Sequence, residues 1–108
     1  MTIKEIQKST EQKVDELMIP IVKYFEENKN LTYAELYNKW EDYKNQLVVS
    51  QYEFIWDTLV KNGVEYPSKF NSDNEIKLLL IIEVPKIFDE IVNEYYYTQI
   101  KSIIVKNF

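Results

Sequence analysis

The sequence predicts one mainly α-helical domain with a small β element and a long C-terminal helix. Three observations support this fold class. Apolar residues recur at helical spacing through most of the chain. The only glycine, Gly63, ends one of the amphipathic segments. The run "EIKLLLIIEV" at 75–84 is apolar and β-branched. Periodicity alone does not decide whether 75–84 is a strand or a helix, so an all-α helical bundle is the alternative.

Composition limits the chemistry of the chain. It has 108 residues, a length suited to a single domain over 1–108, and its 45% hydrophobic content argues against disorder. It contains no cysteine and no histidine, so thiolate chemistry, the commonest general base and the commonest metal ligand are missing. A single glycine does not build a phosphate-binding loop. We therefore expect no enzyme, no cofactor, no metal site and no small-molecule substrate.

The same composition bears on location and origin. No apolar run approaches the ~20 residues of a membrane span, and the charged N-terminus "MTIKEIQKSTEQK" does not resemble a signal peptide. We expect a cytoplasmic protein with no membrane partner. The chain has no arginine and one alanine but is rich in Ile, Lys, Asn and Tyr, which is typical of an AT-rich bacterial, phage or plasmid genome.

The N-terminal segment predicts two helical pieces. Ile6, Val14 and Met18 belong to an apolar row at helical spacing. Pro20 interrupts this row, lacks an N–H group and crowds the preceding turn. The pieces are therefore expected at about 2–18 and 20–28.

The next segment opens with a helix-capping signal. Thr32 and Glu35 have the spacing of a capping box, which predicts a helix from Tyr33 to about Lys44. The polar stretch "KNQL" at 44–47 then predicts a loop.

A third helix is expected after that loop. Ser50 and Glu53 repeat the capping-box spacing and place its start. Asn62 and Gly63 predict its end, because glycine readily adopts the left-handed conformation that follows many helices.

The pattern changes after Gly63. "VEY" at 64–66 fits a short strand, "PSKFNSDN" at 67–74 fits a turn, and 76–84 fits a second strand. Pro85 is tolerated in a first helical turn, so a long helix is expected from there nearly to Phe108.

This order of elements, at "LTYAELYNKW" followed by "VVSQYEFIWDTLVKNGVEY", resembles the winged helix-turn-helix superfamily of small bacterial, phage and plasmid DNA-binding regulators and partition adaptors. The shared features are Leu-Thr-x-x-Glu-Leu at the second helix, a serine before the third, and a glycine that leads into the β-wing. One departure is the spacing. The seven residues "EDYKNQL" separate Trp40 from "VVS", where compact motifs have three or four.

The resemblance implies DNA binding by the third helix and the wing. Glutamine and threonine side chains at outward positions can hydrogen-bond to bases, and nearby lysines can contact phosphates. The implied DNA-binding residues are Lys44, Asn45, Gln46, Gln51, Thr58, Lys61, Lys69, Asn71 and Lys77.

The resemblance also implies a homodimer, because the terminal helix of many such proteins pairs with its copy. The alternative is that this helix packs across its own domain. The implied interface residues are Phe88, Val92, Tyr95, Tyr96, Ile100 and Ile103.

Charge argues for a second class of function. The net charge is -5, and Glu53 and Asp57 would face DNA phosphates. The alternative is an acidic protein-binding module, such as an inhibitor, immunity or phage adaptor protein, that meets a basic protein partner and makes no DNA contact. Residues 76–84 separate the two hypotheses, because a paired strand there makes a wing and a helix removes it.

Overall fold

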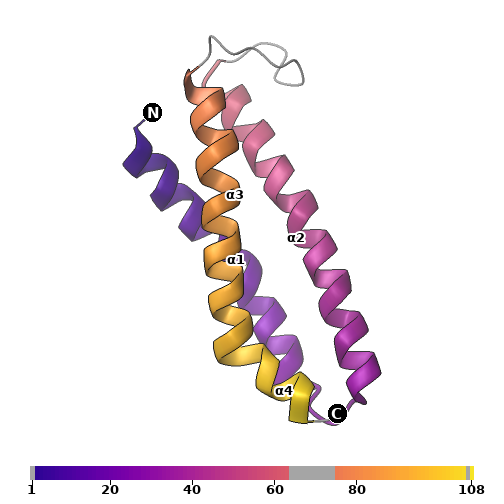
Figure 1. The fold of residues 1–108 in the computed structure, drawn as a ribbon. Helices are drawn as coiled ribbons and strands as arrows, with labels where there is room; N and C mark the ends of the chain where they lie inside the picture. Colours follow the sequence, from indigo (N-terminus) through magenta and orange to yellow (C-terminus); the bar gives the residue numbers. More distant parts are fainter. Residues whose placement is uncertain (1, 64–74, 107) are drawn as a thin grey trace.

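The computed structural model describes residues 2–63, 75–106 and 108, and these form a bundle of helices (Figure 1). No strand occurs in the described ranges. The elements in chain order are α1 (Ile3–Glu27), α2 (Tyr33–Lys61), α3 (Glu75–Tyr95), the π-helical turn η1 (Tyr96–Ile100) and α4 (Lys101–Lys106).

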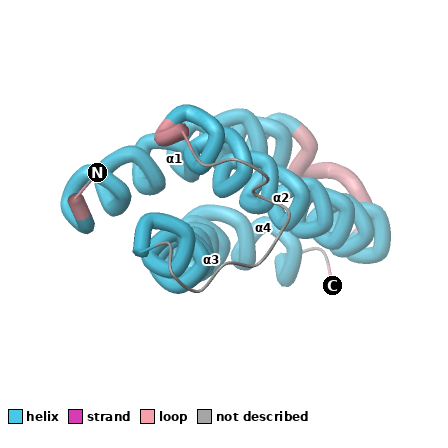
Figure 2. The backbone as a smooth tube through the Cα atoms, turned by 90° about the horizontal axis from the view of Figure 1, so that it is seen from above, coloured by secondary structure: helices cyan, strands magenta, loops and turns pink. Residues whose placement is uncertain are grey.

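Three long rods make up the bundle, because α3, η1 and α4 follow one another without a break. α2 runs antiparallel to α1, and α3 runs back parallel to α1 (Figure 1). α3 packs against both other rods, whereas α1 and α2 contact each other far less. Figure 2 shows α1 and α2 along one side and α3 with α4 along the other. The molecule measures 50 × 24 × 17 Å, and its radius of gyration of 16.2 Å exceeds the ~13 Å of a compact domain of this length.

The predicted β-wing is wrong, and the all-α alternative describes the fold. Residues 76–84 belong to α3. Leu80, Val84 and Phe88 are all buried, at the four-residue spacing that places side chains on one face of a helix. Burial of that face against α1 and α2 therefore decides what local periodicity could not. The predicted first strand and turn, 64–74, lie outside the described residues.

The predicted helix boundaries at the two prolines are also wrong. Pro20 lies inside α1 and Pro85 lies inside α3. A proline removes the donor for the carbonyl four residues earlier, here that of Glu16 or Ile81. Glu16, Pro20 and Ile81 are exposed and Pro85 is half-buried, so both prolines lie toward the surface of the bundle.

The predicted loop at 44–47 is wrong as well, because α2 is one helix from Tyr33 to Lys61. These residues include no proline or glycine, and Leu47 is buried in the core. Ser50 lies in the middle of the helix and caps nothing. The second and third helices of the expected helix-turn-helix are therefore one continuous rod.

Both ends of α2 are capped as the sequence predicts. The Thr32 hydroxyl accepts a hydrogen bond from the Glu35 backbone amide at 3.2 Å. The Glu35 carboxylate accepts in turn from that hydroxyl, at 3.1 Å, in place of the backbone amide expected for a full capping box. At the other end Asn62 is the C-cap and Gly63 has a positive φ of 75°.

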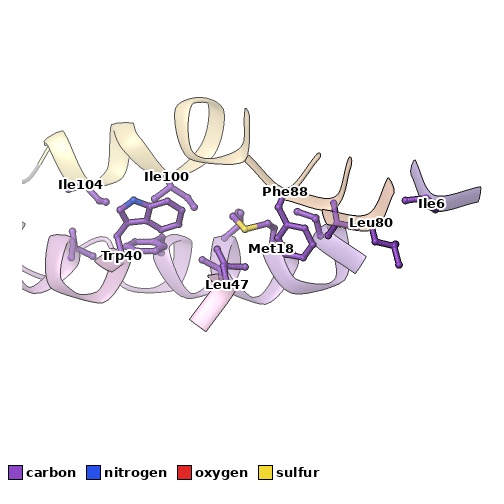
Figure 3. Packing of buried hydrophobic residues seen from close by; sticks show 14 of the residues in the cluster. Ile6, Met18, Trp40, Leu47, Leu80, Phe88, Ile100 and Ile104 are labelled. Atoms are coloured by element: carbon purple, nitrogen blue, oxygen red, sulfur yellow. The ribbon is translucent and has the colours of Figure 1, made fainter. Parts of the chain in front are cut away.

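A continuous apolar core follows the long axis of the bundle (Figure 3). Near the end where α1 joins α2, the ring of Trp40 stacks on the ring of Tyr96, with 4.9 Å between the ring centroids. The same Trp40 ring meets that of Phe25 edge to face, with 6.3 Å between the centroids. The residues labelled in Figure 3 mark the length of the core: Ile6, Met18, Trp40, Leu47, Leu80, Phe88, Ile100 and Ile104.

The π-helical turn sets which side chains of the last rod face this core. In η1 the amide of Lys101 donates to the carbonyl of Tyr96, five residues earlier. A π-bulge places one more residue in the turn than an α-helix does. Ile100, the last residue of η1, and Ile104 in α4 are only 0% and 2% exposed, so both side chains face the core across this turn.

The continuity of α2 leads to a prediction about its two capping-box signals. Thr32→Ala should lower the free energy of unfolding by about 1 kcal/mol, because it removes an N-cap. Ser50→Ala should leave the stability unchanged or slightly raised, because alanine is the better residue inside a helix. Urea denaturation monitored by circular dichroism measures both. A loss of ~1 kcal/mol for Ser50→Ala would show that a helix begins at that residue.

The core position of Phe88 leads to a second prediction. Phe88→Ala should lower the free energy of unfolding by about 3–5 kcal/mol, because the ring is buried inside the chain's own core. The control Tyr97→Ala, at a residue 64% exposed, should change it by less than about 0.5 kcal/mol. Denaturation at several protein concentrations provides the measurement. A dependence of the Phe88→Ala loss on concentration would instead place the ring between two copies.

Candidate protein-interaction surface

A row of apolar and aromatic side chains lies on the solvent side of α2. Four of its members recur every fourth residue and the fifth lies beside the first, which places them on one side of the helix, away from the buried Leu36, Trp40 and Leu47. We call this row the α2 stripe. It consists of Val48, Val49, Tyr52, Trp56 and Val60, whose exposed fractions are 51%, 56%, 66%, 46% and 52%.

The α2 stripe is unusual for a helix on a protein surface. Single exposed apolar residues are common, but a contiguous row that includes a tryptophan and a tyrosine is not. A surface helix ordinarily carries one apolar face toward the core and a polar face toward water. α2 carries apolar side chains toward both, so its outer face is a candidate contact surface for another molecule.

Carboxylates lie along the middle of the α2 stripe, and lysines lie near its two ends, Lys44 and Lys61. Glu53 and Asp57 lie on the exposed surface between its members, and the sequence has no lysine from Asn45 to Val60. Just before this segment, the ammonium group of Lys44 lies 2.8 Å from the carboxylate of Glu41. The middle of the stripe, around Glu53 and Asp57, is therefore acidic.

A groove adjoins the α2 stripe where α2 meets α3. Its volume is about 160 Å³. Leu47 and Phe88 are buried residues that line it, and Val48 belongs both to the groove and to the α2 stripe. The lining residues of this α2–α3 groove are Lys44, Leu47, Val48 and Gln51 from α2 and Phe88, Asp89, Val92 and Asn93 from α3.

A second, larger cleft of about 410 Å³ lies between α1 and the α3–η1 rod. Three acidic residues, Glu11, Asp15 and Glu94, line it together with Tyr95. The Tyr95 hydroxyl donates a hydrogen bond to Asp15 Oδ1 at 2.9 Å. This hydrogen bond, together with burial and the nearby negative charges, raises the pKa of Tyr95 above its usual value of 10.0. In the described parts of the chain, no three acidic side chains are grouped closely enough to hold a metal ion.

The predicted DNA-binding residues do not assemble into a recognition helix and a wing. Thr58 is 8% exposed, and its hydroxyl donates to the Phe54 carbonyl at 2.7 Å. Lys77 is 4% exposed and lies in α3, not on a wing strand. Lys69 and Asn71 lie outside the described residues. The remaining predicted residues are all on α2: Lys44, Asn45, Gln46, Gln51 and Lys61.

The predicted dimer-interface residues pack largely within their own chain. Phe88 and Ile100 are 2% and 0% exposed, so as folded they are not available to a second copy. Tyr95 bonds to α1 and Tyr96 stacks on α2, as described above. The other two, Val92 and Ile103, are half-buried. The terminal helix thus packs across its own domain, and the expected homodimer stays a prediction.

Sequence reasoning missed the α2 stripe because a loop was expected at 44–47. That loop divided the segment into two helices with unrelated faces. A helical projection of 33–61 as one rod places Val48, Tyr52 and Trp56 together, away from Leu36 and Trp40. The signal was therefore present, but it depended on knowing that the helix is continuous.

Comparisons of the chain with models of known protein families, with curated proteins and with solved structures found no match. Among the described residues, no helix combines the length and the apolar character needed to cross a membrane. The winged-helix resemblance is thus supported neither by the comparisons nor by the fold, and the function must be argued from the surfaces themselves.

The hydrogen bond in the acidic cleft leads to a pH-dependent prediction. Because folding raises the Tyr95 pKa, this group contributes stability below pH ~10 that is lost as the pH rises toward the folded-state value. Tyr95→Phe should therefore lose less stability than the native chain between about pH 9 and pH 11. Urea denaturation across this range measures the difference.

A control separates the charge of Asp15 from the hydrogen bond itself. Asp15→Asn keeps an acceptor beside Tyr95 but removes the negative charge, so its loss of stability with pH should be intermediate. If Tyr95→Phe and the native chain lose stability equally over the same range, the Tyr95–Asp15 bond does not form in solution.

Proposed function

We propose that the chain is an acidic, helical protein-binding module and that the α2 stripe is its binding face. The observation that carries this proposal is the row of exposed apolar side chains around Tyr52 and Trp56. Tyrosine and tryptophan are enriched at protein interfaces and among the residues that dominate binding energy. Their burial against a partner would remove an apolar surface that folding alone leaves in water.

Charge supports a basic partner for this module. The chain carries a net charge of -5, and Glu53 and Asp57 flank the α2 stripe. Opposite charges on a partner would speed its capture and select it over acidic competitors. A face of this sign also repels phosphate groups, because nucleic-acid binding depends on cations that displace counterions.

The competing proposal, DNA binding, depended on a wing strand at 76–84. That segment is helical, and Lys77, which the wing was expected to present, is buried. The reason for preferring DNA binding to protein binding is therefore gone, and the acidic module is the better-supported function.

The test replaces the two central anchors of the α2 stripe. The native chain is used to capture a partner from cells that encode the chain. The double variant Tyr52→Ser, Trp56→Ser should capture at least about tenfold less of that partner, because loss of aromatic anchors costs about 2 kcal/mol or more at many interfaces. Tyr97→Ser is a matched control, because Tyr97 is similarly exposed but belongs to η1. Quantitative mass spectrometry of the captured proteins provides the measurement.

Two results would contradict the proposal. One is a partner captured equally by the native chain and the Tyr52→Ser, Trp56→Ser variant. The other is binding of the native chain to duplex DNA at low salt, with an affinity that falls linearly with salt on logarithmic axes. Circular dichroism should show both serine variants folded, since the replaced side chains lie on the surface.

A further inference from the structure

We infer that the module binds a basic amphipathic helix, which lies along the α2 stripe and inserts apolar side chains into the α2–α3 groove. This inference rests on the proposed function and specifies the partner of the same face. The shape of the groove, the spacing of the stripe and the distribution of charge all point to such a helix.

The groove is a mostly apolar depression between two long helices, α2 and α3. Leu47 and Phe88, which are 6% and 2% exposed, belong to the core beneath it. Val48 and Val92 line it from α2 and α3 respectively. A volume of about 160 Å³ suits insertion of a side chain and is too small to enclose a folded element. The occupant must therefore lie on the surface and project individual apolar side chains inward.

The α2 stripe matches the length and spacing of a helix. From Val48 to Val60 it follows α2 for about 18 Å at 1.5 Å per residue. An amphipathic helix that docks on a groove presents apolar anchors at three- and four-residue intervals. Such a helix can contact Val48 in the groove and Tyr52 and Trp56 further along with one continuous face.

Charge determines the polar part of this helix. Asp89 lines the α3 side of the groove, and Glu53 and Asp57 flank the stripe. Lys44 also lines the groove, but Glu41 lies 2.8 Å from it and offsets its charge. Lysine or arginine residues beside the apolar anchors would therefore meet carboxylates across the contact.

The same charges disfavour a second copy of the chain as the occupant. Two copies that pair through this face would place more carboxylates than ammonium groups in the contact, since each contributes Glu53, Asp57 and Asp89 against Lys44 and Lys61. Each copy carries a net charge of -5, and like charges in juxtaposition oppose association. An acidic helix is disfavoured for the same reason, so the sign of the partner is the discriminating variable.

The test uses a synthetic 18-residue helix with leucine at apolar positions and lysine at polar ones. Two control peptides carry glutamate in place of lysine, or the same leucines and lysines in scrambled order. Trp56 reports binding by a blue shift of its fluorescence, since it is 46% exposed whereas Trp40 is 5% exposed. We expect one peptide bound per chain, with affinity at least about tenfold higher than for either control.

Variants of the chain locate the binding site. Val48→Lys should weaken binding of the lysine peptide by about tenfold or more, whereas Val105→Lys, a matched change at an exposed residue of α4, should not alter it. Glu53→Gln with Asp57→Gln should weaken it severalfold and reduce its dependence on salt. Asp15→Asn in the acidic cleft should leave it unchanged.

Three results would overturn the inference. The first is equal binding of the glutamate and lysine peptides, and the second is loss of lysine-peptide binding in Asp15→Asn but not in Val48→Lys. The third is self-association of the native chain, measured by sedimentation equilibrium, that Val48→Lys abolishes. The lysine peptide could fail to bind while the Tyr52→Ser, Trp56→Ser variant still captures less partner than the native chain. In that case the α2 stripe is a binding face and only the inferred class of partner is wrong. If neither binding is observed, the protein-binding proposal fails too.

Discussion

Burial of one face of α3 is the constraint on which the rest of the structure depends. Leu80, Val84 and Phe88 lie in the core, and α3 is the rod that packs extensively against both others. The backbones of α1 and α2 approach each other less closely than either approaches α3, although aromatic rings such as those of Phe25 and Trp40 meet between them. Without α3, much of their apolar faces would therefore remain in water. The helical state of 76–84 is therefore set by what that segment must cover.

The same constraint explains which predictions from the sequence hold. The Thr32 cap and the stop at Gly63 depend on backbone groups within a few residues, and the structure confirms both. The breaks expected at Pro20 and at 44–47 are wrong, because packing of the flanking turns against α3 outweighs a missing hydrogen bond or a polar run. Local chemistry therefore predicts helix ends better than helix continuity.

The candidate site was less predictable than the fold. The DNA-binding residues came from a resemblance, and residues such as Thr58 and Lys77 are buried for reasons that a linear pattern does not contain. The α2 stripe becomes visible only when 33–61 is one helix, since the faces on either side of a loop are unrelated. The acidic balance around Glu53 and Asp57 could be read directly, and it favours the alternative that the structure leaves standing.

The elongated outline of the bundle has a consequence for measurements on the purified protein. With extents of 50 × 24 × 17 Å, a single chain tumbles and diffuses more slowly than a sphere of the same mass. Size-exclusion chromatography calibrated with globular standards will therefore overestimate its molecular weight and can make a monomer resemble a dimer. Light scattering, which reports mass independently of hydrodynamic shape, distinguishes the two.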